Sequence, residues 1–178
     1  IAVLGAGSWG SALAQVFSEN KKTSITILHH NAYYDTHSHF KYFSDVPIPK
    51  EINITSNKND IIDADIFFIV QPTKVINETL DWINKYSTSN SPIIVNCSKG
   101  FDYKSKMTFY QLVSKKYPRL KDTYCILSGP SHAEEVINKL PTAVVVASNN
   151  ISNAEKIQNL FSNNYFRIYT SVDIIGVE

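Results

Sequence analysis

The sequence lacks several features that mark particular classes of protein. No apolar run approaches the ~18 residues of a membrane-spanning helix, and we expect neither a signal peptide nor a membrane span. Neither sign of charge is in excess, because 17 Lys and Arg stand against 16 Asp and Glu. This balance argues against a nucleic-acid partner. No repeat or low-complexity linker divides the 178 residues, a length that suits one full hydrophobic core.

Methionine is absent from the first position, and cysteine is scarce. The chain begins at Ile1 and its last residues, 174–178, stop within a pattern, so we expect a part of a longer protein. Cys97 and Cys125 each accompany a strand-like apolar run, and we expect both to be buried free thiols. Such thiols indicate a reducing compartment and a cytoplasmic location. We expect no bound metal.

Apolar runs alternate along the chain with segments of helical spacing. The expected strands span residues 1–4, 24–28, 66–70, 92–96, 124–127, 142–147 and 166–169. The expected helices span residues 9–19, 58–63, 74–86, 105–117 and 152–162, with another from residue 131, and residues 31–50 are expected to be a loop. Continuously apolar early strands indicate a sheet covered on both faces. The pattern therefore predicts an α/β fold with a doubly wound, mostly parallel Rossmann-type sheet and helices on both faces.

A glycine motif follows the first expected strand, with Gly5, Gly7 and Gly10 enclosing Ser8 and Trp9. The first glycine of such a motif permits a tight turn, the second lets a pyrophosphate approach the backbone, and the third lets helix and strand pack closely. The helix N-terminus then offers unpaired N–H groups to the phosphates. The motif predicts dinucleotide binding, and a purely structural glycine turn is the alternative.

No acidic residue follows the second expected strand, where an NAD-preferring site usually places one to bind the ribose 2′-hydroxyl. His29, His30 and Asn31 stand there, and the nearest acid is Asp35. His30 could bind a 2′-phosphate, and would do so better when protonated. It could equally be a solvated loop histidine. This position favours NADP slightly over NAD.

Two further strand ends carry candidate residues, because ligands of such sheets bind at the carboxyl ends of the strands. Pro72 follows the third strand, where it either lines the cofactor site or simply begins a helix. Lys99 follows the fourth strand and precedes a glycine. A lysine beside a nicotinamide could hold a substrate carbonyl by charge and hydrogen bonding. The alternative for Lys99 is a solvated surface position.

The segment SGPSHAEE follows the fifth strand. Ser131 is a plausible N-cap, with Glu134 three residues later to complete a capping box. Such a helix start could also bind an anion or a substrate. His132 is a weaker candidate for an acid–base role, since no partner is evident in the sequence.

Taken together, the motifs resemble one family along almost all of the chain. GAGSWGSALA, the PT after the third strand, SKG, LSGPSHAEEV, PTAVVVAS and RIYTSVDIIGVE are similar in order and spacing to the bacterial type of NAD(P)-dependent glycerol-3-phosphate dehydrogenase. The resemblance implies reversible hydride transfer between a nicotinamide and C2 of a three-carbon phosphate. Dihydroxyacetone phosphate and sn-glycerol 3-phosphate would be interconverted, in support of glycerophospholipid synthesis. A homodimer is an assembly that this resemblance allows.

The resemblance also implies roles for individual residues. In addition to the glycines and Pro72, the implied cofactor contacts are Ser8, Trp9, His30, Lys99 and Ala133. Lys99 would also touch the substrate, and Gly129 and Ser131 would lie on the substrate side. Residues 1–171 would form the NAD(P)-binding domain, and residues 172–178 would begin a C-terminal helical substrate domain.

The chain departs from the family pattern in two places. Residues 31–50 form a short segment compared with the usual pattern. The resemblance implies that the second lysine of the family, the usual general acid/base, would lie beyond residue 178. The helical domain that binds the substrate phosphate would lie there too. We therefore expect these residues to bind cofactor but to turn over poorly. The alternatives are a non-catalytic NAD(P)-binding module and another dehydrogenase of the same fold.

Overall fold

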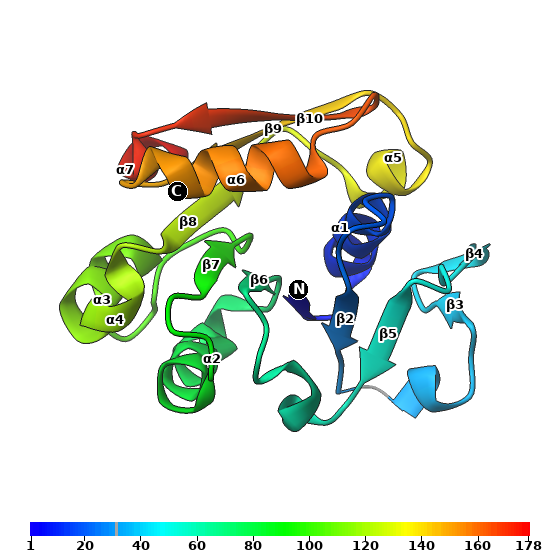
Figure 1. The fold of residues 1–178 in the computed structure, drawn as a ribbon, viewed down its shortest axis with the longest axis horizontal. Coiled ribbons are helices and arrows are strands. Elements are labelled where there is room, and N and C mark those ends of the chain that lie inside the picture. Colours follow the sequence, from blue (N-terminus) through cyan, green and yellow to red (C-terminus); the bar gives the residue numbers. More distant parts are fainter. Residues whose placement is uncertain (31) are drawn as a thin grey trace.

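The computed structural model describes residues 1–30 and 32–178, which form an eight-stranded sheet and a separate two-stranded sheet (Figure 1). The order in the large sheet is β10-β9-β8-β7-β6-β1-β2-β5. Its strands are β1 (Ala2–Leu4), β2 (Ile25–Leu28), β5 (Ile52–Thr55), β6 (Ile66–Ile69), β7 (Ile93–Asn96), β8 (Tyr124–Ser128), β9 (Thr142–Ala147) and β10 (Phe166–Ser171). The small sheet pairs β3 (His39–Phe40) with β4 (Phe43–Pro47).

The described helices include seven α-helices and two short 3₁₀ helices. They are α1 (Ser8–Ser18), α2 (Thr73–Tyr86), α3 (Phe109–Lys116), α4 (Pro118–Lys121), α5 (Ala133–Ile137), α6 (Ile151–Phe161), α7 (Ile174–Val177), η1 (Ala32–Asp35) and η2 (Lys58–Ile61). Within the described part of the chain, none of them is long and apolar enough to cross a membrane.

Strand direction decides where ligands can bind. Every neighbouring pair in the large sheet is parallel except β8 and β9, which are antiparallel. The carboxyl ends of β1, β2, β6, β7 and β8 therefore meet at one edge of the sheet. The carboxyl ends of β9 and β10 lie at the opposite edge of the sheet. The segment after β10 therefore leaves the sheet on the side away from the carboxyl ends of the other strands.

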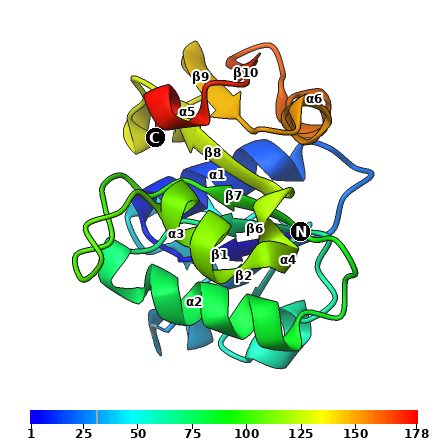
Figure 2. The ribbon, with the colours of Figure 1, turned by 90° about the vertical axis from the view of Figure 1, so that its left-hand side faces the viewer.

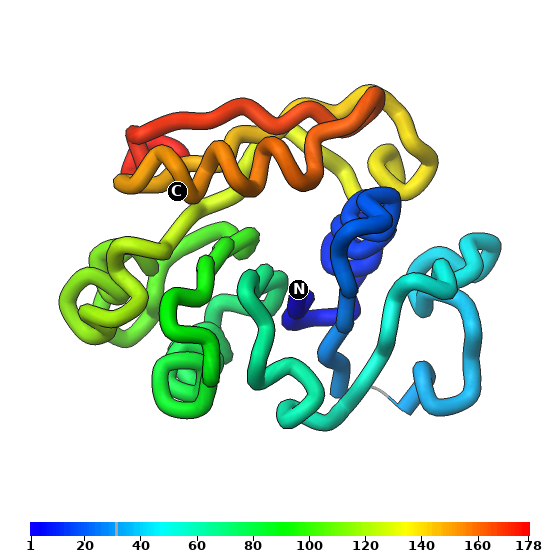
Figure 3. The backbone as a smooth tube through the Cα atoms, in the orientation of Figure 1, coloured from blue at the N-terminus to red at the C-terminus, as the bar shows by residue number. Residues whose placement is uncertain are grey.

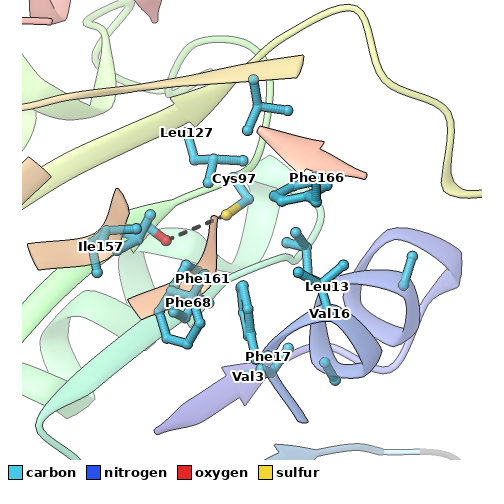
Figure 4. Packing of buried hydrophobic residues seen from close by; sticks show 14 of the residues in the cluster. Val3, Leu13, Val16, Phe17, Phe68, Cys97, Leu127, Ile157, Phe161 and Phe166 are labelled. Carbon is cyan, nitrogen blue, oxygen red and sulfur yellow. Dashed lines mark hydrogen bonds between the residues drawn. The ribbon is translucent and has the colours of Figure 1, made fainter. Parts of the chain in front are cut away.

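The core lies in two layers, one on each face of the sheet. Val3 and Phe68 face a cluster that includes side chains of α1, α5 and α6, whereas Phe67 faces a cluster with side chains of α2, α3 and α4. Figure 2 shows the two sets of helices around the sheet. In the first cluster the centre of the Phe17 ring lies 4.3 Å from the centre of the Phe68 ring and 4.2 Å from that of the Phe161 ring (Figure 4). The predicted doubly wound, mostly parallel sheet with helices on both faces is confirmed.

The segment expected to be a loop at residues 31–50 has more structure than predicted. Its residues 32–50 contain η1, β3 and β4, and they lie at the end of the molecule opposite to α3 and α4 (Figure 3). Residue 31 lies outside the described residues. The edge strand β5 follows and was missed, although it pairs in parallel with β2 along its whole length. It has only four residues, two of which are polar, so the sequence shows no continuous apolar run there.

Two expected helix starts were wrong. The helix expected at residue 105 begins at Phe109, because Thr108 and Gln111 form a capping box there. The capping box expected from Ser131 and Glu134 does not form: α5 begins at Ala133, with His132 as an N-cap whose side chain makes no capping hydrogen bond. The N–H of Ser131 donates instead to the carbonyl of Gly129, at 3.0 Å.

The last residues pack against the sheet rather than away from it. The side chain of Ile174 is buried in the second cluster. The carboxylate of Glu178 accepts a hydrogen bond from the hydroxyl of Tyr124 at 2.9 Å and from the N–H of Tyr110 at 3.1 Å. Burial raises the pKa of the Tyr124 hydroxyl well above its usual value, with the Glu178 charge as a further cause. The hydroxyl therefore stays protonated and able to donate.

Candidate functional site

The glycine loop between β1 and α1 is shaped by steric necessity. Gly5 has a φ of +123°, a conformation that side chains disfavour, and a Cβ at this position would overlap the carbonyl oxygen of Val70. A Cβ at Gly10 would overlap the carbonyl oxygen of Gly5. The first and third glycines therefore serve the turn and the close approach of the helix to it.

Gly7 is different from the other two glycines of the loop. Its backbone is extended, with φ −75° and ψ −178°, and a Cβ built on it would meet no atom within 4 Å. Gly7 is also the N-cap of α1, where no side chain caps the helix and no acidic residue stands in the first turn. The space over Gly7 and the free amides of the helix start fit an incoming anion such as a pyrophosphate.

A cavity of about 300 Å³ opens beside the helix start, and we call it the Lys99 pocket. It is bounded by the residues that follow β1, β7 and β8. Its lining consists of Ser8, Trp9, Cys97, Lys99, Leu127, Ser128, Gly129, Ser131, His132, Ala133 and Glu134. The structure thus brings Ser8, Trp9, Lys99, Gly129, Ser131 and Ala133, all named from the sequence, into one cavity. Their roles stay predictions.

The segment that carries Lys99 is tied to its neighbours. The hydroxyl of Ser98 donates to the carbonyl of Gln71 at 2.6 Å, which joins the end of β7 to the end of β6. Further along, buried Asp102 accepts from the N–H of Ser105 at 2.7 Å and from Nδ2 of Asn77 on α2 at 2.5 Å. The hydrogen bonds from Ser105 hold the pKa of Asp102 below its usual value, so this carboxylate is ionised at neutral pH. Lys99 itself is exposed to the cavity.

The far wall of the Lys99 pocket has its own packing requirements. A Cβ at Gly129 would come within 2.9 Å of the carbonyl oxygen of Ala143, so close packing of β9 also explains this glycine. Cys97 forms part of the wall and Cys125 lies deeper; both are buried free thiols, as predicted. Burial raises the pKa of both thiols, that of Cys125 to about 12. Neither is a nucleophile at neutral pH.

A second cavity, of about 200 Å³, lies at the ends of β1 and β2 beside α2, and we call it the Trp82 pocket. Its lining consists of Leu4, Leu28, His30, Lys58, Gln71, Val75, Glu78, Thr79 and Trp82. His30, predicted to meet a 2′-phosphate, is here exposed at the rim. Pro72, also predicted as a cofactor contact, is the exposed N-cap of α2 and lines neither pocket.

The Trp82 pocket holds the residues that sequence reasoning missed. Val75, Glu78, Thr79 and Trp82 are spaced so that they share one face of α2. These intervals of three and four residues are visible in the sequence and indicate one helix face. The contribution of Lys58 had no such signal, because only the fold brings η2 beside α2.

Comparisons with known proteins agree with this arrangement. Residues 1–154 match the family model described as NAD-dependent glycerol-3-phosphate dehydrogenase N-terminus. The chain is 39% identical over 184 residues to a glycerol-3-phosphate dehydrogenase [NAD(P)+] of Bacillus pumilus, covering 100% of this chain and 53% of the relative. The corresponding protein of Lactiplantibacillus plantarum is 39% identical over 191 residues, covering 100% of this chain and 55% of the relative. The chain thus spans about half the length of the curated relatives it matches.

Solved structures agree as well. A glycerol-3-phosphate dehydrogenase structure from Coxiella burnetii superimposes with a TM-score of 0.87 at 26% identity, covering 99% of this chain and 55% of that one. A Plasmodium falciparum glycerol-3-phosphate dehydrogenase has a TM-score of 0.86 at 21% identity, covering 98% and 53% of the two chains. The second likeness bears on the fold alone.

Proposed function

Because the chain belongs to the family of NAD-dependent glycerol-3-phosphate dehydrogenase N-termini, we propose that it is the dinucleotide-binding domain of such a dehydrogenase. The reaction is the interconversion of dihydroxyacetone phosphate and sn-glycerol 3-phosphate with NAD(H) or NADP(H). One observation carries the proposal beyond membership of the family. The open space over Gly7, at an uncapped helix start, adjoins a cavity that contains a lysine.

The two pockets divide the proposed cofactor site between them. Gly5, Gly7 and Gly10 shape the loop on which the pyrophosphate rests, with Ser8 and Trp9 at the helix start. The Lys99 pocket takes the nicotinamide, with Ala133 in its wall, and the Trp82 pocket takes the adenosine, with His30 at its rim. Pro72 contributes by starting α2, one face of which lines the second pocket.

A nicotinamide held in the Lys99 pocket would supply or accept the hydride at the substrate carbon. The ammonium group of Lys99 holds the substrate oxygen and stabilises the negative charge that develops on it. The backbone around Gly129 and the side chain of Ser131 bound the substrate side of the cavity. The buried, protonated thiol of Cys97 takes no part in proton transfer but keeps that wall apolar.

Residues 1–171 form the proposed cofactor domain, and residues 172–178 lead into the proposed substrate domain. That domain would supply a proton-donor lysine and the groups that bind the substrate phosphate. Loss of a proton donor typically lowers a rate by ~10²–10⁴-fold, so residues 1–178 alone should bind cofactor and turn over poorly. Two buried free thiols favour a cytoplasmic location, where the product would feed glycerophospholipid synthesis. We propose a homodimer for the whole enzyme.

The test is a titration of residues 1–178 with NADPH and with NADH, followed by tryptophan fluorescence. Trp9 and Trp82 are the two tryptophans of the sequence, and one lines each pocket, so saturable quenching is expected. Gly7→Ser is the decisive variant, because serine is a good N-cap but would fill the space over the loop. We expect it to fold normally and to bind either dinucleotide at least about tenfold more weakly. Absence of binding by the parent chain, when folded, would contradict the proposal.

A further inference from the structure

The Trp82 pocket has an apolar floor and a charged rim. Leu4 and Leu28, at the ends of β1 and β2, form the floor together with Val75 and the ring of Trp82. Three ionisable side chains stand around it: those of His30, Lys58 and Glu78. An apolar slot rimmed by polar groups suits a planar base attached to a charged or hydroxylated sugar.

Lys58 is well placed for an anion. Its Nζ lies over the ring of Trp82, 5.7 Å from the ring centre. Two residues further along η2, the carboxylate of Asp60 accepts from Thr55 Oγ1 at 2.6 Å and from Asn57 Nδ2 at 3.1 Å, which joins η2 to the segment before it. Within residues 1–30 and 32–178, the ammonium group of Lys58 has no carboxylate partner. The Lys58 side chain can therefore meet a phosphate without breaking an ion pair.

Glu78 supplies the carboxylate that is missing after β2. The acid nearest to that strand in sequence, Asp35, lies on η1 and does not line the pocket. Glu78 reaches the pocket from α2 instead, and among the described residues it too forms no ion pair. A carboxylate accepts hydrogen bonds from ribose hydroxyls but repels a phosphate dianion. The pocket therefore contains one group that suits each form of the cofactor.

We propose that Lys58 and Glu78 together set the choice between NADP(H) and NAD(H), with Lys58 binding the 2′-phosphate and Glu78 binding the ribose hydroxyls. This inference rests on the proposed function, because it assumes that the adenosine end of a dinucleotide occupies the Trp82 pocket. Lys58 and His30 give the rim two cationic or ionisable groups against one carboxylate. The chain binds NADPH more tightly than NADH but retains both.

The experiment compares five chains by calorimetric titration: the parent, Lys58→Gln, Lys58→Arg, Glu78→Gln and the control Lys85→Gln. Lys85 is an exposed lysine of α2 that lines neither pocket. The probes are NADPH and NADH, together with adenosine 2′,5′-bisphosphate and AMP. The last two carry no nicotinamide and so report on binding outside the Lys99 pocket.

We expect Lys58→Gln to lower the affinity for NADPH and for the bisphosphate about tenfold, as for loss of one charge-assisted hydrogen bond. The affinities for NADH and AMP should change less than about twofold. Glu78→Gln should act in the opposite sense, raising the ratio of NADPH to NADH affinity about threefold or more. Lys58→Arg should restore most of the NADPH affinity, and Lys85→Gln should change nothing.

The outcomes separate the two proposals. If the folded parent binds neither dinucleotide, the proposed function fails and this inference fails with it. Suppose that the parent binds both dinucleotides, and that neither Lys58→Gln nor Glu78→Gln changes the ratio of NADPH to NADH affinity from that of the parent. The proposed function then stands, and only this inference is overturned.

Discussion

The Lys99 pocket and the Trp82 pocket lie at the same edge of the sheet but are built in different ways. Leu4 lines the Trp82 pocket and Ser8 lines the Lys99 pocket, so the glycine loop runs between the two pockets. Segments after three strands enclose the Lys99 pocket, and hydrogen bonds to carbonyls and a buried carboxylate fix the segment that carries its lysine. The rim of the Trp82 pocket consists of exposed side chains: Lys58 from η2, Glu78 from α2 and His30 after β2.

This difference separates what the fold determines from what surface substitution can tune. Moving a residue of the Lys99 pocket disturbs backbone packing, as the close approach of Gly129 to β9 shows. Replacing Lys58 or Glu78 changes a charge on a side chain that no described ion pair restrains. We therefore expect the chemistry at Lys99 to be coupled to stability, and the cofactor preference at Trp82 to be independent of it.

The largest effect expected is one that removes both pockets at once. Gly10→Val would drive a side chain into the carbonyl oxygen of Gly5 and separate α1 from the loop. The backbone cannot yield there without moving β1, so we expect the free energy of unfolding to fall by about 3 kcal/mol or more. Urea denaturation measures this. Gly7→Ser is the matched control and should unfold within about 0.5 kcal/mol of the parent, because nothing lies in its way. Equal midpoints for Gly10→Val and the parent would contradict the steric account.

The first βα unit could be predicted from the sequence because its constraints are local. The glycine spacing specifies the turn, and the apolar run before it specifies a buried strand. The other strands of the large sheet, apart from β5, were also predicted, since continuous apolar runs need no partner to be recognised. For the same reason the pocket around Lys99 could be anticipated: its residues follow strands whose order along the chain was already predicted.

The parts that were missed depend on contacts that no local pattern reveals. β5 pairs with β2, but its four residues, INIT, are too few to form the continuous apolar run that marks the central strands. Ser131 and Glu134 have the spacing of a capping box, but the turn at Gly129 occupies the Ser131 N–H, and the helix starts later. The Trp82 pocket requires η2 and α2 to come together, and single-sequence reasoning has no means to place them.

Asp102 offers a way to disturb one pocket and spare the other. Asp102→Ala would leave the N–H of Ser105 and the amide of Asn77 without their acceptor in a buried place. We expect a loss of about 1–2 kcal/mol in the free energy of unfolding, and faster hydrogen exchange in residues 99–107. Exposed Asp45 accepts a 3.5 Å hydrogen bond from Ser44, and it gives the control Asp45→Ala, for which we expect no change. AMP binding should be unaffected in both; weaker AMP binding in Asp102→Ala would show that the pockets are not independent.

The smallest effect concerns the thiols, of which Cys97 belongs to the wall of the Lys99 pocket and none lines the Trp82 pocket. Burial raises the pKa of both thiols in the folded chain, that of Cys125 to about 12, above the usual value of 9.0. Between those two pH values the unfolded chain has lost thiol protons that the folded chain keeps. The contribution of the two thiols to the free energy of unfolding is therefore fully present below pH 9, and it is lost as the pH rises toward 12.

At pH 10 the loss should be about 1 kcal/mol for each thiol. Urea denaturation at pH 8 and pH 10 measures it, and the difference between the parent and Cys97→Ala isolates one thiol from the tyrosines and lysines that titrate nearby. Cys125→Ala is the companion variant, since Cys125 lies behind the wall rather than in it. If Cys97→Ala has the same pH dependence as the parent while Cys125→Ala is flatter, Cys97 ionises freely in the folded chain. Water would then reach the wall of the Lys99 pocket, and the apolar surface assigned to it beside the substrate would be wrong.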